Sequence, residues 1–178
     1  MVDLEYRPFP DLDGRNWRQE ALEIPAMARL LGIGRGLRLL EVGCGRGNAL
    51  TPIDRLLAPR HLVGLDIDET LLAVAARRLH MEGTRATLIP GDVRNLPFPD
   101  ASFDVVIDFG TCYHVARQCD ALREIARVLT PGGRFITETK INQFVSHPIR
   151  SRGRHLPWDA VPGLVPSRWA FFWESRRR

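Results

Sequence analysis

The stretch LLEVGCGRGNAL, residues 39–50, decides the fold. Its apolar start is typical of a buried strand, and Gly43, Gly45 and Gly47 follow at alternate positions. Glycine adopts backbone angles that other residues resist, and it leaves no side chain between the backbone and a bound group. The spacing G-x-G-x-G also differs from the G-x-G-x-x-G of dinucleotide-binding turns. We therefore expect a tight turn after a strand, with a ligand close to its backbone.

Apolar runs that read as strands alternate with amphipathic runs of helical spacing along the rest of the chain. The expected strands are residues 37–42, 61–65, 86–89, 104–109, 134–139 and 168–174. The expected helices are residues 16–31, 51–57, 68–80 and 118–129. This alternation predicts a Rossmann-like α/β fold, which is a doubly wound, mainly parallel sheet with helices on both faces. We expect about six strands, the last one antiparallel, in a shortened C-terminal part.

Several helix ends carry recognisable signals. Asp13 or Asn16 would cap the first helix, and Pro25 inside it predicts a kink or a later start. Asp68 would cap the helix over 68–80, and Gly83 follows its end. The breaker Pro131-Gly132-Gly133 would close the helix over 118–129.

Length and composition fit a soluble globular domain of 178 residues with 44% hydrophobic and 26% charged residues. We expect a single domain over residues 1–178, in which 1–36 form an N-terminal lid or helix, 37–139 the cofactor-binding core, 140–167 a loop and 168–174 the last strand. No apolar run approaches the roughly 20 residues that span a bilayer. The acidic, proline-broken start does not resemble a secretory signal, so we expect a cytoplasmic protein.

The cysteines and histidines do not suggest a metal site. Cys44, Cys112 and Cys119 are odd in number and lack metal-ligand spacing, so reduced thiols are expected. His147 and His155 lie in the expected loop, where a histidine is more often on the surface than a ligand. We assign no metal.

Acidic residues follow two of the expected strands. Asp66 lies nineteen residues after Gly47, about where a carboxylate accepts hydrogen bonds from both hydroxyls of a ribose. Asp92 follows the third strand and could accept from the exocyclic amine of adenine, while the amide of Val93 could donate to a ring nitrogen. Each feature alone fits a turn or a helix cap. Their order and spacing together predict a nucleoside site at the strand ends.

With these motifs the sequence resembles the class I S-adenosylmethionine-dependent methyltransferases, in the small-molecule branch that includes the quinone-biosynthesis methyltransferases. The resemblance covers residues 37–138 and rests on LLEVGCGRGNAL, VGLDIDETLLAVAARR, GDVRNLPFPDASFDVVID, YHV and ALREIARVLTPGGRFI. It implies S-adenosyl-L-methionine as cofactor and S-adenosyl-L-homocysteine as product. The cofactor-binding residues that it implies are Glu41, Gly43, Cys44, Gly45, Asp66, Ile67, Asp92, Val93 and Asp108.

The resemblance also assigns roles to these residues. Glu41, Gly43 and Gly45 would line the methionine part of the cofactor. Asp66 would hold the ribose, with Ile67 against the adenine. Asp108 would face the site from the end of the fourth strand.

A sulfonium methyl group is already activated, so the protein mainly positions the nucleophile and excludes water. His114 is the candidate general base, with a purely structural histidine as the alternative. Tyr113 could hydrogen-bond the acceptor or simply pack. Cys112 lacks the neighbouring proline–cysteine motif of pyrimidine-carbon methylases, which disfavours a nucleophilic role.

Both ends of the chain raise further expectations. Tyr6, Trp17 and Arg18 would belong to the lid, where an aromatic face suits a sulfonium cation, although Trp17 could equally pack on the sheet. About forty residues follow the fifth strand, so the last strand would leave an exposed edge that invites a homodimer.

The function expected is methyl transfer to a small molecule, without a membrane or nucleic-acid partner. Three alternatives stay open. The first is an RNA or protein methyltransferase that uses the basic C-terminal region. The second is a non-catalytic S-adenosylmethionine-binding protein. The third, a nicotinamide-dependent dehydrogenase, is disfavoured by the glycine spacing.

Overall fold

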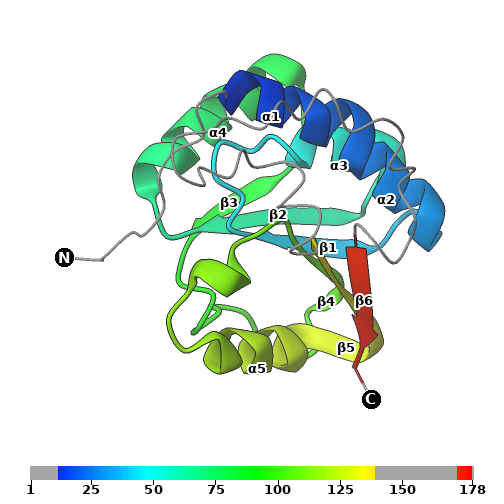
Figure 1. The fold of residues 1–178 in the computed structure, drawn as a ribbon, viewed down its shortest axis with the longest axis vertical. Helices are drawn as coiled ribbons and strands as arrows, with labels where there is room; N and C mark the ends of the chain where they lie inside the picture. Colours follow the sequence, from blue (N-terminus) through cyan, green and yellow to red (C-terminus); the bar gives the residue numbers. More distant parts are fainter. Residues whose placement is uncertain (1–11, 139–171, 178) are drawn as a thin grey trace, which may run out of the picture.

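A six-stranded sheet with the order β3-β2-β1-β4-β5-β6 forms the centre of the computed structural model, which describes residues 12–138 and 172–177 (Figure 1). The strands are β1 Arg38–Val42, β2 His61–Asp66, β3 Thr87–Pro90, β4 Phe103–Asp108, β5 Leu129–Glu138 and β6 Phe172–Arg176. Strands β1 to β5 pair in parallel, and β6 pairs antiparallel with β5. The predicted class, a Rossmann-like α/β fold, is confirmed.

Helices cover both faces of the sheet. They are α1 Leu12–Arg18, the π-helix η1 Gln19–Glu23, α2 Ile24–Leu31, α3 Leu50–Leu57, α4 Glu69–Glu82, the 3₁₀-helix η2 Cys112–His114 and α5 Gln118–Val128. Figure 1 shows α1 to α4 on one face and α5 on the other. The parallel strands are therefore buried from both sides, which explains why their sequences are almost continuously apolar.

Alternate residues of β1 enter two separate cores. Leu39 belongs to the cluster that contains residues of α2, α3 and α4. Leu40 and Val42 belong to the cluster that contains residues of α5. These apolar residues of β1 thus anchor the strand in both helical layers, and Glu41 is the buried polar residue between them.

Two glycines allow the layers to approach closely. A Cβ atom at Gly47 would lie 3.2 Å from the Cβ of Ala75 in α4. A Cβ at Gly64 in β2 would lie 2.9 Å from the sulfur of Cys44. The turn after β1 is thus packed against both its neighbouring helix and its neighbouring strand.

The signals at α4 are confirmed. Asp68 caps the helix, because its carboxylate accepts from the backbone N–H groups of Thr70 at 2.8 Å and Leu71 at 3.3 Å. Gly83 ends it in the left-handed conformation, at φ +64°. Here the local sequence dictates both ends of the helix.

The start of the first helix was predicted wrongly. Helix α1 begins at Leu12, so Asp13 and Asn16 lie within the helix and not at its start. The predicted disturbance at Pro25 takes the form of a π-turn, in which the N–H of Ile24 donates to the carbonyl of Gln19. A proline inside an α-helix clashes with the carbonyl four residues earlier, and the wider π-turn relieves that contact.

The C-terminal part also differs from its prediction. Helix α5 ends at Val128, and Pro131-Gly132-Gly133 lies inside β5 instead of between helix and strand. Two backbone hydrogen bonds to Arg177 hold both glycines. The N–H of Gly132 donates to the carbonyl of Arg177, and the N–H of Arg177 donates to the carbonyl of Gly133. The described part of the last strand spans Phe172–Arg176, so the strand ends two residues beyond the predicted end at 174, where pairing with β5 continues.

Some predicted features lie outside the described residues. They are Tyr6, the loop over 140–167 with His147 and His155, and residues 168–171. The backbone of Tyr113 is described as part of η2, but its side chain is not.

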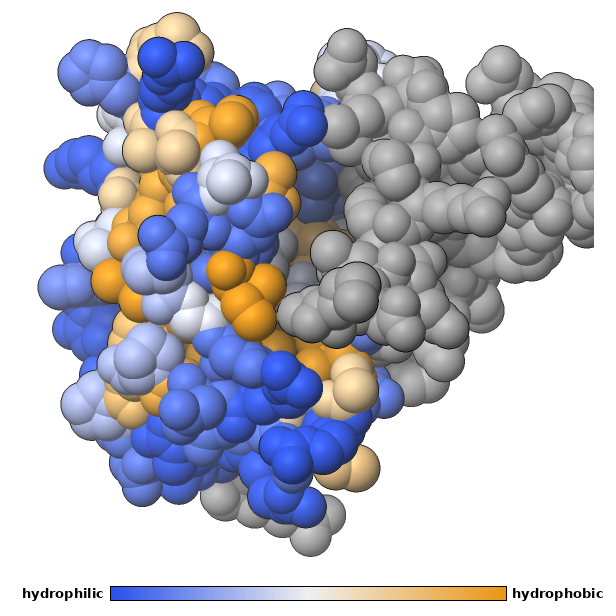
Figure 2. Space-filling view, turned by 90° about the vertical axis from the view of Figure 1, so that its left-hand side faces the viewer, coloured by the Kyte–Doolittle hydropathy of each residue, from blue (hydrophilic) through white to orange (hydrophobic). Residues whose placement is uncertain are grey.

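Large apolar side chains also reach the surface. Trp17 is 64% exposed, so the alternative in which it packs on the sheet is wrong. Figure 2 shows apolar side chains interspersed with hydrophilic ones on the left-hand side of Figure 1, which is ordinary for a protein surface. Among the described residues, no helix combines the length and apolar character that a membrane span needs.

Candidate functional site

The strand register brings the carboxyl ends of four strands to one edge. Val42 at the end of β1 pairs with Leu65 in β2 and with Asp108 at the end of β4. Asp66 at the end of β2 pairs with Pro90 at the end of β3. In doubly wound sheets, ligands bind beyond this edge, where the strand order reverses.

The turn after β1, residues 43–47 (the glycine turn), is hydrogen-bonded to the end of β2. The N–H groups of Gly43 and Cys44 both donate to the carbonyl of Leu65, at 2.7 and 3.0 Å. Gly43, Gly45 and Gly47 all have positive φ angles, between +51° and +74°. The predicted need for three glycines is therefore explained by backbone conformation as well as by space.

The glycines of the turn face different surroundings. A Cβ at Gly43 would overlap the side chain of Thr111, whereas a Cβ at Gly45 would meet nothing within 4 Å. Gly45 therefore leaves open space next to the backbone. This is the position at which a bound group can approach the turn most closely.

Asp66, at the end of β2, also hydrogen-bonds the glycine turn. Its Oδ2 accepts from the N–H of Gly45 at 2.7 Å, and its Oδ1 accepts from the N–H of Asp68 at 2.9 Å. Each carboxylate oxygen has a second lone pair, so both can accept from a ligand hydroxyl as well. The ribose role of Asp66 remains a prediction, and these contacts show that the side chain is held in place.

Glu41 is the least satisfied polar group of the site. Its side chain is buried, and its Oε2 has no hydrogen-bond partner among the described residues. Burial raises the pKa of Glu41 well above its ordinary value, and the nearby carboxylates of Asp66 and Asp108 raise it further. A buried acceptor without a partner is rare in folded proteins and fits a site that a cationic or hydrogen-bond-donating ligand completes.

Asp92 is held by its own neighbour. The guanidinium of Arg94 bonds both of its carboxylate oxygens, with Nε at 3.0 Å from Oδ1 and 2.9 Å from Oδ2. This pairing lowers the pKa of Asp92. The adenine role of Asp92 stays a prediction, in which the amine shares the carboxylate with Arg94.

Asp108 is held by the loop after β4, and its predicted contact with the cofactor remains a prediction. It is fully buried and accepts from the N–H groups of Gly110 at 2.9 Å, Thr111 at 2.6 Å and Cys112 at 3.2 Å. The hydroxyl of Thr137 in β5 donates to it as well. Asp108 thus shapes the loop after β4 and acts on the site through its charge.

The apolar site residues differ in exposure. Ile67 is 64% exposed directly after β2, so its side chain is accessible at the position that the adenine contact needs. Val93 is buried, so only its backbone N–H is suited to reading a base. Both roles remain predictions.

The candidate catalytic residues cluster after β4. His114 is exposed and belongs to η2 together with Tyr113. The Cys112 and Cys44 thiols are buried, which raises the pKa of both, so neither is prepared to form a thiolate nucleophile. All three cysteines are unpaired, and no group of residues able to hold a metal ion occurs within 12–138 and 172–177.

Two contacts escaped the sequence analysis. Arg94 lies two residues after Asp92 in GDVRNL, and this spacing is a local signal that could have been read. The packing of Thr111 against Gly43 joins residues far apart in the chain, so no local signal exists for it.

Fold and strand-edge geometry together define a class of protein: doubly wound α/β domains with carboxyl groups gathered at the carboxyl ends of the parallel strands. Within that class, the chain belongs to the methyltransferase domain family, whose sequence profile matches residues 40–137, more than half of the chain. This membership confirms the predicted resemblance. It also implies S-adenosylmethionine as the cofactor, and the orphaned Glu41 oxygen and the open space at Gly45 fit that cationic ligand.

Individual relatives support the same assignment. The fatty-acid O-methyltransferase of Mycolicibacterium smegmatis is 38% identical over 101 residues, which cover 57% of this chain and 36% of that protein. The ubiquinone/menaquinone biosynthesis C-methyltransferase UbiE of Azotobacter vinelandii is 37% identical over 126 residues, covering 68% and 47%. The chain thus spans between about a third and a half of the length of these relatives.

A solved structure shares the fold as well. The crystal structure of the [4+2]-cyclase SpnF superimposes with a TM-score of 0.61 and 30% identity, over 65% of this chain and 43% of that one. A protein named for cyclisation therefore carries the same architecture, and the activity must be argued from the site.

Substituting Glu41→Gln tests the electrostatics of the site. The raised pKa means that the folded protein binds a proton here more tightly than the unfolded chain, so Glu41 makes the protein less stable as pH rises above the ordinary value. Glu41→Gln should therefore raise the free energy of unfolding without ligand by roughly 1–3 kcal/mol at pH 8 and by less toward pH 4. Urea denaturation across this range measures the difference.

The exposed Glu69→Gln serves as the matched control and should show little change with pH. A Glu41→Gln protein less stable than the wild type at pH 8 would contradict this account of the site.

Proposed function

We propose that the chain binds S-adenosyl-L-methionine at this edge and transfers its methyl group to a small molecule, releasing S-adenosyl-L-homocysteine. The observation that carries the proposal is the buried Glu41 carboxyl, whose Oε2 has no partner among the described residues, beside Asp66 and Asp108. A ligand with an ammonium and a sulfonium group places positive charge next to these three carboxyl groups.

The same charges argue against a dinucleotide. A pyrophosphate needs unpaired N–H groups at a helix N-terminus, with positive potential around it. Here the turn N–H groups of Gly43 and Cys44 are used by Leu65, and that of Gly45 is used by Asp66. The nicotinamide-dependent alternative is therefore disfavoured by hydrogen bonding as well as by glycine spacing.

The bound sulfonium supplies an activated methyl group, and the chain's own residues do the rest. The glycine turn and Asp66 would hold the cofactor, with Ile67 against the adenine. Buried Asp108 fixes the loop that presents Tyr113 and His114 beside the strand ends. His114 would take a proton from an acceptor that needs to lose one.

A small-molecule acceptor is supported by the relatives, whose names concern fatty acids and quinones. The alternative of an RNA or protein acceptor relied on the basic C-terminal region. Arg177 in that region donates to the backbone carbonyls of Arg127 and Leu129, so the fold itself uses one of its cations. This observation favours the small molecule.

A second candidate function is a cofactor-binding protein that does not methylate. The structural likeness to a protein named as a [4+2]-cyclase favours this second candidate, because a protein with the same fold is named for a reaction other than methyl transfer. The two candidates differ in one readout: transfer of a labelled methyl group to any member of a small-molecule panel supports the enzyme, and tight cofactor binding without transfer supports the alternative.

Substituting Asp66→Ala tests the cofactor site. The loss of charge-assisted hydrogen bonds should weaken cofactor binding by about 1.5–3 kcal/mol, roughly 10- to 150-fold in Kd, measured by calorimetry. Asp54→Ala is the control, because Asp54 also accepts from a backbone N–H but lies on α3, away from the strand ends. Unchanged affinity in Asp66→Ala would contradict the ribose role.

Substituting His114→Ala separates binding from chemistry. Cofactor affinity should stay unchanged, because the imidazole is exposed and lies on η2 outside the glycine turn. Turnover on an identified acceptor then decides between a base and a structural histidine. Weakened cofactor binding would instead move His114 into the cofactor site.

We also propose that the chain forms a homodimer through β6. This strand is the last in the order of the described sheet, and an edge strand can offer backbone groups to a second copy. Light scattering should give twice the chain mass of 20.2 kDa. A monomer at micromolar concentration would contradict the proposal.

A further inference from the structure

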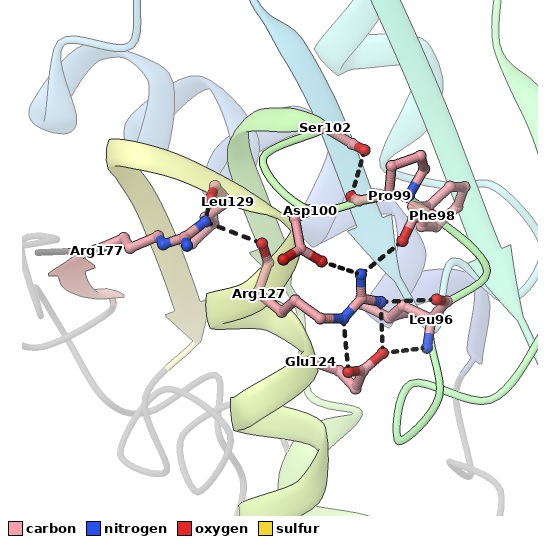
Figure 3. A network of polar contacts seen from close by, with 9 residues as sticks. All are labelled: Leu96, Phe98, Pro99, Asp100, Ser102, Glu124, Arg127, Leu129 and Arg177. Carbon is pink, nitrogen blue, oxygen red and sulfur yellow. Dashed lines mark hydrogen bonds and ion pairs between the residues drawn. The ribbon is translucent and has the colours of Figure 1, made fainter.

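The guanidinium of Arg127 on α5 is engaged on every side (Figure 3). Its Nε and Nη2 donate to the two carboxylate oxygens of Glu124, at 2.8 and 2.7 Å. Its Nη1 donates to the carbonyl of Phe98 at 2.7 Å and to the carboxylate of Asp100 at 2.9 Å. Such a contact set needs the planar fork of arginine, because a lysine ammonium is a single point charge.

Arg127 and Glu124 together hold both backbone groups of Leu96. Arg127 Nη2 donates to the carbonyl of Leu96 at 2.9 Å, and Glu124 Oε2 accepts from the N–H of Leu96 at 2.8 Å. The pKa of Glu124 is lowered, mainly by its bonds to Arg127. The pair is therefore charged at neutral pH. From α5 it hydrogen-bonds both backbone groups of Leu96, in the loop after β3.

Leu96 is the far end of the turn that carries the predicted adenine contacts. The near end is fixed to β2, since the N–H of Gly91 donates to the carbonyl of Asp66 at 2.9 Å. Between the two ends, the N–H of Asn95 donates to the carbonyl of Asp92 at 2.9 Å and closes the turn around Val93. The turn is thus held at one end by the sheet and at the other by the Glu124–Arg127 pair.

Arg127 is itself braced from the C-terminal strand. The guanidinium of Arg177 donates to the carbonyl of Arg127 at 2.9 Å and to that of Leu129 (Figure 3). The carbonyl of Arg127 lies in the last turn of α5, where no helical N–H remains for it, and Leu129 directly follows the helix. The C-terminal part of α5, which carries Glu124 and Arg127, is therefore fixed in position.

We propose that Arg127, with Glu124, is a positioning residue for base recognition: it sets the place of the Asp92 carboxylate and the Val93 N–H and so determines the preference for adenine. Neither side chain needs to touch the ligand. The inference rests on the proposed cofactor site. It adds a residue that determines base preference and that lies on α5, on the face of the sheet opposite α1 to α4.

Two ligands that differ only in the base test the proposal. They are S-adenosylhomocysteine and its hypoxanthine analogue, which replaces the amine by a carbonyl and presents an N–H at the adjacent ring nitrogen. In place of the amine, the analogue places an acceptor opposite the Asp92 carboxylate, and its ring N–H opposes the N–H of Val93. Calorimetry on the wild type should therefore show a preference for adenine of about tenfold or more.

In Arg127→Gln this preference should fall at least about threefold, because a more mobile turn no longer holds the Asp92 carboxylate and the Val93 N–H in the positions that favour adenine. Arg127→Lys keeps the charge without the fork and should also lose preference, which covers the case in which Arg127→Gln does not fold. The matched control is Arg38→Gln, which removes another arginine–carboxylate pair, with Asp104, at the amino end of β1. It should lower the melting temperature and leave the preference unchanged.

The outcomes separate the two claims. A preference that is intact in folded, ligand-binding Arg127→Gln and Arg127→Lys would overturn the positioning role, as would a wild type that binds both ligands equally. A wild type that binds neither ligand would instead overturn the proposed cofactor site.

Discussion

Two backbone hydrogen bonds to one carbonyl oxygen organise this protein. The N–H groups of Gly43 and Cys44 both donate to Leu65, and the next residue, Asp66, binds the N–H of Gly45. These contacts join the turn after β1 to the end of β2 before any ligand is bound. They require the left-handed backbone that glycine adopts without strain, and they leave Gly45 next to open space. The site is therefore preorganised by the fold itself.

The second constraint is electrostatic. Glu41 is buried beside two further carboxyl groups, and its pKa is raised as a consequence. Without a cation this arrangement costs stability, since a buried charge is expensive when it is unpaired. A positively charged ligand removes that cost. Binding and folding are thus coupled through the same carboxyl group, a trade of stability for function that is common at binding sites.

Much of the fold could be predicted because its signals are local. The buried strands showed as continuous apolar runs, and Asp68 and Gly83 marked the ends of α4. The errors occurred where distant contacts decide. Pro131-Gly132-Gly133 signals a break, yet pairing with Arg177 draws it into β5. Pro25 signalled a disturbed helix, but no local signal showed that the helix extends back to Leu12 through a π-turn.

The site shows the same division. The identity of the acidic residues and their order along the strands followed from the sequence, because parallel strands end at one edge. Their hydrogen-bond partners did not, since Asp108 turned out to bind the loop after β4 and the Glu124–Arg127 pair reaches across from α5. Spacing alone predicts which residues gather, whereas the packing decides which of their atoms remain for a ligand.

The central claim is that the acidic strand edge binds a nucleoside that carries positive charge. Calorimetric titration of the wild-type protein with S-adenosylmethionine and with NAD, side by side, tests it most directly. The account predicts saturable one-to-one binding of S-adenosylmethionine and no binding of NAD. Saturation by NAD, or no heat of binding with S-adenosylmethionine, would contradict it.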